Sequence, residues 1–196
     1  MKIFYIDTLG DLRDQSLCVL DGVPEGIGLK YSFLVKGREL SDSYPENAAI
    51  RMSDDREGIK LASLIGNTNR FLIVNTKIKE IIENKSDLES KMKIEYLPVS
   101  IINHKNKVHS DDYFIINPVG YIDVVDYDLS VINYFKDKVL SIKRLILDET
   151  KIELAPVIFR IKEDPTKYFM KDILTNAINE GDFSNIKFIE VVVNKE

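Results

Sequence analysis

The sequence has very little cysteine and no long run of apolar residues. Cys18 is the single cysteine among 196 residues, so no disulfide can form within the chain and no cysteine-based zinc site can be built. Cys18 lies in the apolar stretch Leu-Cys-Val-Leu, which predicts a buried and unreactive thiol. No apolar run approaches the roughly 18 residues that a membrane-spanning helix needs. We therefore expect neither adaptation to an oxidising compartment nor contact with a membrane.

Positive charge is also scarce. The chain has 27 lysines and arginines against 32 aspartates and glutamates, a net charge of −5. Duplex nucleic acid needs a concentrated basic surface, so we expect no nucleic-acid partner. The N-terminal apolar run breaks at Asp7, too early for a secretory signal, which predicts a cytoplasmic protein. The glycines at 22–28 precede an apolar stretch that resembles a strand, and without a helix N-terminus they form no phosphate loop. We expect no cofactor.

The remaining composition is that of a globular protein, with 44% apolar and 30% charged residues. The length suits a single domain over residues 1–196. Its first part, 1–60, is irregular, with predicted strands at 2–6 and 31–35. The polar segment 41–58 reads as a loop that a short strand at 49–52 interrupts.

From residue 71 onward the patterns are clearer. Two stretches, 71–97 and 168–192, each read as an apolar strand, a short amphipathic helix and a second strand. The predicted helices cover 75–84 and 171–180. The other predicted strands cover 71–74, 93–102, 113–117, 121–126, 139–147, 157–161 and 186–193. The sequence therefore predicts an α+β fold with a mixed, mostly antiparallel sheet and a few short helices.

The stretch 121–128 carries three carboxylates, Asp123, Asp126 and Asp128. The Pro-Val-Gly at 118–120 predicts a hairpin that joins this stretch to strand 113–117. Asp126 and Asp128 would share one face of a strand, where two carboxylates can bind a divalent cation. Aspartate and serine are also favoured where a strand ends, because they cap backbone N–H groups. The capping role is the interpretation that we prefer.

A second alternative is a metal-dependent, nuclease-like hydrolase. The stretch 145–151 ends in Asp-Glu-Thr-Lys, similar to the Glu-x-Lys motif of restriction-endonuclease-like enzymes. Asp126 and Glu149 would hold the metal and Lys151 would orient the attacking water. The motif is short and unspecific, and we expect no catalytic and no metal-binding residues.

The two histidines, His104 and His109, lie close to Asp111 and Asp112. Such a group could hold a metal ion. The surrounding stretch is polar and loop-like, where ligands are hard to place rigidly. We therefore expect a solvated loop.

An ordered series of short motifs resembles one known family. The residues that carry the resemblance are Tyr96 and Pro98, Tyr113 and Asn117, Asp126 and Ser130, Phe159 and Arg160, and Gly181 and Phe188. Over residues 70–192 this series is similar to a family of bacterial polymorphic-toxin immunity proteins, formerly a domain of unknown function.

The resemblance implies a protein without catalytic activity that neutralises a cognate toxin by direct binding in the producing cell. It also implies that Asp126, Ser130 and Arg160 hold the fold, and we expect them to pair in a buried polar network. A regulatory or phage-encoded interaction protein without a toxin is the other non-catalytic alternative.

The acidic segment 41–58 is the predicted binding surface for the toxin. It lies outside the 70–192 core, it is polar, and it holds an aromatic residue among carboxylates. The candidate interface residues are Asp42, Tyr44, Glu46, Asp54, Asp55 and Glu57. Their charge predicts a basic face on the toxin. The sequence is also compatible with self-association into a homo-oligomer.

Overall fold

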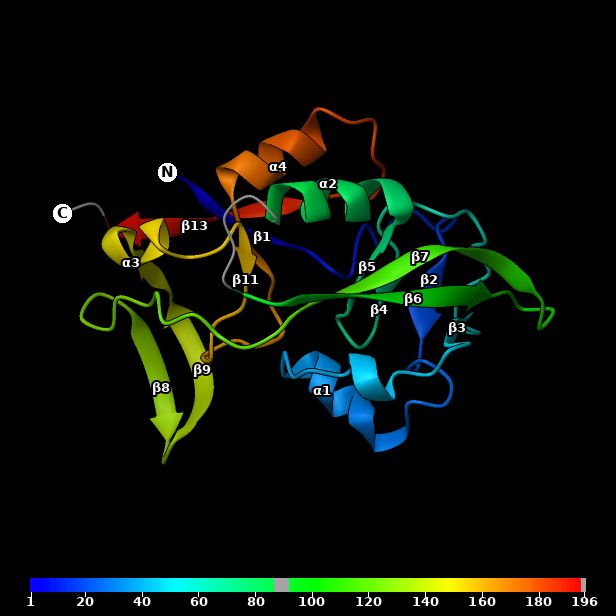
Figure 1. Cartoon of the computed structure of the whole chain (residues 1–196), viewed down its shortest axis with the longest axis horizontal. Helices are drawn as coiled ribbons and strands as arrows, with labels where there is room; N and C mark the ends of the chain where they lie inside the picture. The colour runs from blue at the N-terminus through cyan, green and yellow to red at the C-terminus, as the bar shows by residue number, and fades with distance from the viewer. Residues whose placement is uncertain (87–91, 195–196) are drawn as a thin grey trace.

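The computed structural model describes residues 1–86 and 92–194 of the chain. Strands dominate, and the helices are short (Figure 1). In chain order the elements are β1 (Ile3–Ile6), β2 (Val19–Asp21), η1 (Gly28–Lys30), α1 (Tyr31–Val35), η2 (Ser41–Ser43), β3 (Ala49–Met52), β4 (Gly66–Asn67), β5 (Leu72–Asn75), α2 (Thr76–Ser86), β6 (Ile94–Ile102), β7 (Val108–Pro118), β8 (Val131–Phe135), β9 (Lys138–Arg144), β10 (Ile146–Asp148), α3 (Glu149–Glu153), β11 (Ile158–Phe159), β12 (Phe169–Lys171), α4 (Asp172–Asn179) and β13 (Phe188–Asn194).

The strands form two sheets and one separate hairpin. The six-stranded sheet has the order β4-β2-β3-β6-β7-β5, and the five-stranded sheet has the order β10-β13-β1-β12-β11. Strands β8 and β9 form a two-stranded sheet of their own. Parallel pairs join β2 to β4, β3 to β6 and β10 to β13, while the other paired strands run antiparallel. The predicted α+β class with a mixed, mostly antiparallel arrangement is confirmed.

Both predicted strand–helix–strand units are present, and they share one topology. In the first unit α2 follows β5 and precedes β6, and β7 lies antiparallel between the two strands. In the second unit α4 follows β12 and precedes β13, and β1 lies antiparallel between them. Helices α2 and α4 pack against each other, side by side in Figure 1. The part of the first unit at 87–91 lies outside the described residues.

Alternating side chains of β5 serve two different cores. Ile73 points to the core that also holds Leu34 of α1. Leu72 and Val74 point to the opposite face, where Ile78 of α2 packs with them. Because all of these side chains are fully buried, each contributes about 1.5–3 kcal/mol to stability. The period-2 alternation of the strand thus joins the two layers of the molecule.

Two predicted strands are wrong. Residues 31–35 form helix α1, which is followed by Gly37 in the left-handed region with φ of 54°. Residues 121–126 form no strand, and only Val125 makes an isolated bridge, to Leu147. The hairpin with 113–117 cannot form because β7 is already paired with β6 on one edge and β5 on the other. The sequence-based prediction assumed a free edge on strand 113–117, but both edges of this strand are paired.

The remaining predicted strands differ mainly in length. The strand at 49–52 is confirmed as β3, while the stretch 139–147 is divided between β9 and β10, and 157–161 shortens to β11. Among the described residues, the longest helix has 11 residues, and none is long and apolar enough to cross a membrane.

Candidate functional site

Asp126 organises a turn. Its Oδ1 accepts hydrogen bonds from the backbone N–H groups of Asp128 at 3.1 Å and Leu129 at 3.0 Å. Its Oδ2 accepts from Nδ2 of Asn194 at 3.1 Å, which connects the turn to the end of β13. Both carboxylate oxygens thus bond to groups of the chain itself, in the manner of a capping residue.

Ser130 completes the same turn but does not meet Arg160. Its backbone N–H donates to the carbonyl oxygen of Asp126 at 3.0 Å. Its hydroxyl donates to the carbonyl of Ile146 and accepts from the N–H of Ile146, both at 3.0 Å. The expected pairing of Asp126, Ser130 and Arg160 in one network is therefore wrong with respect to Arg160, which is held by other residues.

The geometry does not assemble the nuclease-like group. Asp126 and Glu149 line one small hollow of about 140 Å³ with Asp148. However, Asp148 caps α3, and its hydrogen bonds with Thr150 hold the pKa of the carboxyl below its ordinary value. Lys151 points elsewhere, with Nζ 3.7 Å from Oδ2 of Asp123. No group of three or more His, Cys, Asp or Glu side chains suited to a metal ion occurs in residues 1–86 and 92–194.

Arg160 is almost completely buried and links distant parts of the chain. Its guanidinium donates to the carbonyl oxygens of Leu34 at 2.9 Å and Val35 at 3.4 Å, at the C-terminal end of α1. It also donates to the hydroxyl of Tyr168 at 2.8 Å and to Oδ1 of Asn117 at 3.4 Å. A cation that satisfies the last carbonyls of a helix fixes where that helix ends.

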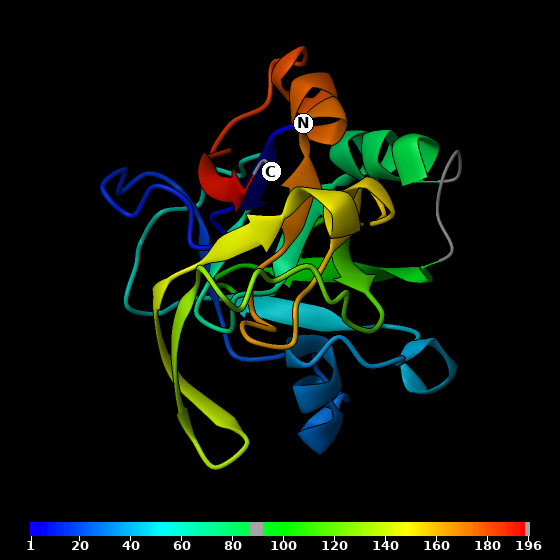
Figure 2. The same cartoon turned by 90° about the vertical axis from the view of Figure 1, so that its left-hand side faces the viewer.

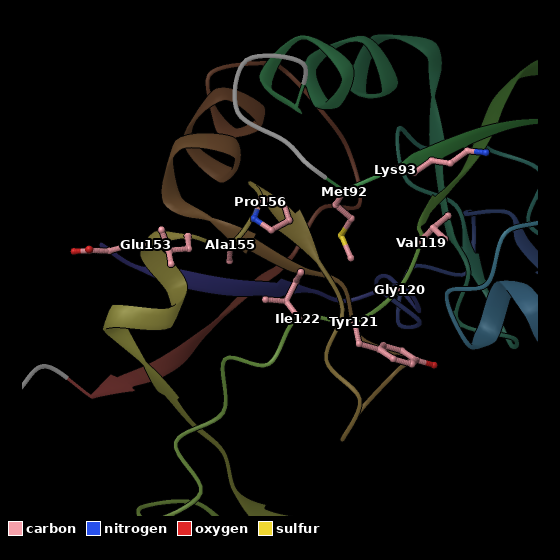
Figure 3. A pocket seen from close by; sticks show the side chains of 10 residues that line it. Met92, Lys93, Val119, Gly120, Tyr121, Ile122, Glu153, Ala155 and Pro156 are labelled. Atoms are coloured by element: carbon pink, nitrogen blue, oxygen red, sulfur yellow. The ribbon is translucent and has the colours of Figure 1, made fainter.

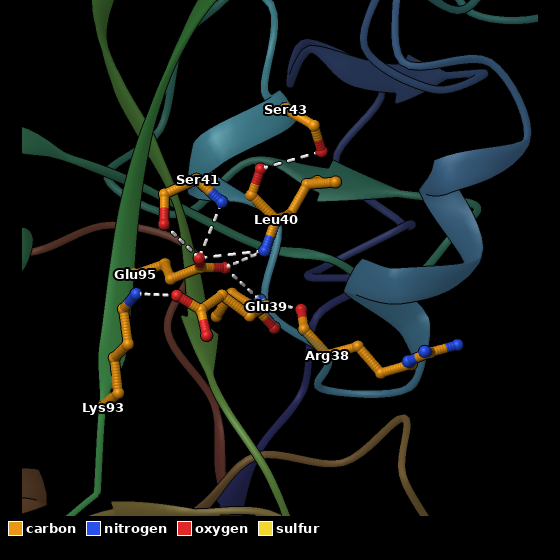
Figure 4. A network of polar contacts seen from close by, with 8 residues as sticks. Arg38, Glu39, Leu40, Ser41, Ser43, Lys93 and Glu95 are labelled. Atoms are coloured by element: carbon orange, nitrogen blue, oxygen red, sulfur yellow. Dashed lines mark hydrogen bonds and ion pairs between the residues drawn. The ribbon is translucent and has the colours of Figure 1, made fainter.

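Asn117 connects Arg160 to a second buried charge, Glu95. Figure 4 shows the carboxylate of Glu95 against Leu40 and Ser41. Glu95 is 3% exposed. It accepts from the N–H of Leu40 at 2.9 Å, from the N–H of Ser41 at 2.7 Å and from Nδ2 of Asn117 at 2.8 Å. Burial raises the pKa of Glu95, but the hydrogen bonds from Ser41, Leu40 and Asn117 outweigh it and leave the pKa below its ordinary value. Glu95 thereby attaches the first residues of the acidic segment to strand β6 through the backbone of Leu40 and Ser41.

The acidic candidates of segment 41–58 separate into two groups. Asp42 and Glu46 precede β3, while the others follow it, and all five carboxylates are exposed. Tyr44 is different, because it packs against the core and donates from its hydroxyl to the carbonyl of Pro98 at 3.0 Å. Its side chain serves the fold. We define the acidic patch as the group after β3, namely Asp54, Asp55 and Glu57.

The acidic patch lies beside the turn between β6 and β7. Strand β3 runs parallel to β6, with Arg51 opposite Ile102, so the residues after both strands meet. Oδ1 of Asp54 lies 3.8 Å from Nδ1 of His104, and Nε2 of His109 lies 3.2 Å from the carbonyl oxygen of Ile59. His104 lies in the turn between the strands, as expected, whereas the expected loop is wrong for His109, Asp111 and Asp112, which belong to β7. Both histidines are exposed.

A shallow groove of about 800 Å³ lies between α3 and the segment after β7 (Figure 3). Side chains of Met92, Ile122, Ala155 and Pro156 give it an apolar floor, and Tyr121 stands at one end. Its described lining has one carboxylate, that of Glu153, and no histidine, cysteine or serine. Such an open apolar surface is suited to contact with another molecule but does not define which one.

The hairpin of β8 and β9 was not recognised from the sequence. It extends away from both sheets in Figures 1 and 2, and it pairs with no third strand in the described part of the chain. Exposed apolar side chains cover it: Val131, Tyr134, Phe135 and Leu140. The stretch 131–142 could have indicated it, because two runs rich in strand-forming residues flank Lys136 and Asp137. This is the spacing of a hairpin with a two-residue turn.

The comparisons with known proteins agree with the motif series. A family model described as the immunity protein family Imm11 matches residues 11–193. The match extends well beyond residues 70–192 and takes in most of the N-terminal part, including the acidic segment. Curated proteins give no match to the chain. Because the family model covers nearly the whole length, the chain belongs to the immunity protein family Imm11.

Proposed function

We propose that this protein neutralises a cognate bacterial toxin by direct protein–protein binding, in the cytoplasm of the cell that makes both. The observation that carries the proposal is the family match over residues 11–193. The described geometry supports a non-catalytic role, because the carboxylates of Asp126 and Asp148 are used to cap a turn and a helix. An exposed, partly apolar and partly charged surface is what a binding protein requires.

We also propose that the acidic patch steers the toxin through a basic face on the toxin. Asp54, Asp55 and Glu57 are all exposed, and the side chain of Asp54 is fully accessible. Because the acidic patch lies inside the family match, the proposal for the patch rests on the exposure and the charge of its residues. Complementary charges raise the association rate most strongly at low ionic strength.

The function is tested with the toxin domain encoded next to the gene of this chain. We expect co-expression of the chain to restore growth of cells that produce this toxin domain, and the two purified proteins to form a complex. A toxin that kills equally well with the chain present, or that does not bind it, would contradict the proposal. It would favour a regulatory or phage-encoded interaction protein.

Steering is tested by changing Asp54, Asp55 and Glu57 to lysine. The association rate constant should fall at low salt, where the Debye length exceeds ~10 Å, and approach the wild-type value at high salt. The matched control changes Glu80, Glu180 and Asp182 to lysine, which alters the net charge equally at other exposed positions. If the association rate constants of the patch variant and the wild type coincide at every salt concentration, the acidic patch does not steer the toxin.

A further inference from the structure

The hairpin of β8 and β9 is less supported by the rest of the fold than any other strand pair described. Its strands pair only with each other, and a two-stranded hairpin alone is marginally stable in water. Ile132 is the residue of the hairpin that packs partly against a core cluster. A hollow of about 410 Å³ separates Tyr134 and Val139 from Glu163 and Pro165. The hairpin thus stands off the body of the molecule, as Figure 2 shows.

Large apolar side chains at its far end face solvent. Phe135 is 61% exposed and Leu140 is 67% exposed. Tyr134, next to Phe135, is 48% exposed. Isolated exposed apolar residues are ordinary, but a group on one projecting element marks a contact surface. Aromatic side chains in particular supply the anchors of protein interfaces.

The charge of the hairpin is opposite to that of the chain. Residues 131–144 hold four cations and one anion, a net charge of +3, in a chain whose total is −5. The cations are Lys136, Lys138, Lys143 and Arg144, and the anion is Asp137. All of them are exposed. A surface that combines this charge with aromatic side chains is complementary to an acidic, partly apolar surface.

Lys136 occupies a position in the turn that disfavours lysine. Its φ is 53°, in the left-handed region, where glycine or asparagine avoids the steric cost that other residues meet. Its Nζ lies 5.8 Å from the ring centroid of Phe135, within reach of a cation–π contact. The turn therefore keeps a cation beside the exposed ring although glycine would fit the backbone better.

From these observations we infer that the hairpin is a binding arm whose basic, aromatic tip docks on an acidic and partly apolar surface of the cognate toxin. The inference rests on the proposed function and names a surface separate from the acidic patch. A protein is the better fit to the arm than a nucleic acid. Three net positive charges are few for a phosphate backbone, and they sit on a chain that is otherwise acidic.

The test measures the dissociation constant between the full chain and the toxin domain encoded by the neighbouring gene. Replacing Phe135 and Leu140 by alanine should weaken binding at least about tenfold. The matched control replaces Leu29 and Ile173 by alanine, since these are also exposed apolar residues but lie off the arm. The control should bind as the wild type does.

Two further variants separate charge and turn conformation from packing. Changing Lys136, Lys138 and Lys143 to glutamate should slow association at low salt, whereas the same change at Lys30, Lys77 and Lys187 should not. Lys136→Gly should melt at the same temperature as the wild type or higher, because it relieves the backbone, and yet bind more weakly.

If the wild type binds the toxin domain and the arm variants bind it equally well, the arm is refuted and the proposed function stands. If the wild type does not bind, the proposed function falls and the inference falls with it. Tighter binding of the full chain to duplex DNA or RNA than to the toxin domain would also overturn the inference.

Discussion

The guanidinium of Arg160 lies over the ring of Tyr168, with Cζ 4.1 Å from the ring centroid, and donates a hydrogen bond to the hydroxyl of the same tyrosine. That hydroxyl also accepts from the backbone N–H of Leu72 at 3.1 Å. One tyrosine thus joins β5 of the six-stranded sheet to the arginine that follows β11. The contact explains why an arginine is buried at this position, since its charge is shared among acceptors from several segments.

Replacing Arg160 by lysine should lower the free energy of unfolding by about 2–4 kcal/mol. Lysine keeps the charge but cannot present the planar fork that reaches Leu34, Asn117 and Tyr168 together, so buried acceptors lose their donors. Urea denaturation measures the effect. The control is Arg144→Lys on the exposed hairpin, expected within about 0.5 kcal/mol of the wild type. Equal stability of both variants would contradict the role of Arg160.

Replacing Glu95 by glutamine should destabilise the protein by about 1–3 kcal/mol near neutral pH. The donors of Leu40 and Ser41 would lose a charged acceptor. The pKa of Glu95 is lower in the folded protein than the ordinary value of 4.5. The stabilisation from its ionised form is therefore present above pH 4.5 and is lost as the pH falls through the folded pKa.

The measurement is urea denaturation of wild type and Glu95→Gln between about pH 3 and 8. The difference between the two free energies of unfolding should be constant above about pH 6 and shrink in acid. Glu25→Gln, at an exposed ion pair with Arg51, is the control. A difference that grows as the pH falls would show that the sign of the linkage is wrong.

Asp126→Ala should lower stability by about 1–2 kcal/mol, because the N–H groups of Asp128 and Leu129 lose their acceptor. Asp128→Ala is the control, since Asp128 is exposed and takes part in the turn through its backbone. Thermal melts with and without Mg²⁺, Mn²⁺ or Zn²⁺ should coincide for the wild type. A metal-dependent rise in melting temperature that Asp126→Ala and Glu149→Ala both abolish would restore the nuclease-like alternative.

Cys18 should stay unreactive in the folded protein. Burial raises the pKa of its thiol to about 12, and the side chain lies in an apolar core, so the reactive thiolate is scarce at neutral pH. We expect a thiol reagent such as DTNB to label the chain at pH 8 only after denaturation. Rapid labelling of the native protein would show that the core around Cys18 opens easily.

Local patterns were enough to predict the strand–helix–strand units. Ile78 and Ile82 of α2 recur at helical spacing, and both are fully buried. The run that ends in Val74 is a buried strand. Such periodicities depend only on neighbours in the sequence, because they express which face of an element meets a core. The capping role of Asp126 is local in the same sense.

These local patterns could not predict which distant segments pair with each other. Residues 121–126 have the composition of a strand, but whether they pair depends on free sheet edges, and β5 and β6 occupy both edges of β7. Residues 31–35 are rich in β-formers, yet the segment becomes a helix whose last carbonyls Arg160 satisfies. The strand propensity of a short segment is overridden when a long-range contact stabilises the helical conformation.

The sequence by itself determined the class of the fold, the two repeated units and the family, because each follows from composition, periodicity or an ordered series of residues. The tertiary structure alone decided that Arg160 meets Tyr168 rather than Asp126, and that residues 131–144 stand off the body as an exposed hairpin. Whether a whole hairpin is covered depends on which other elements pack against it, and contacts between residues distant in the sequence decide that.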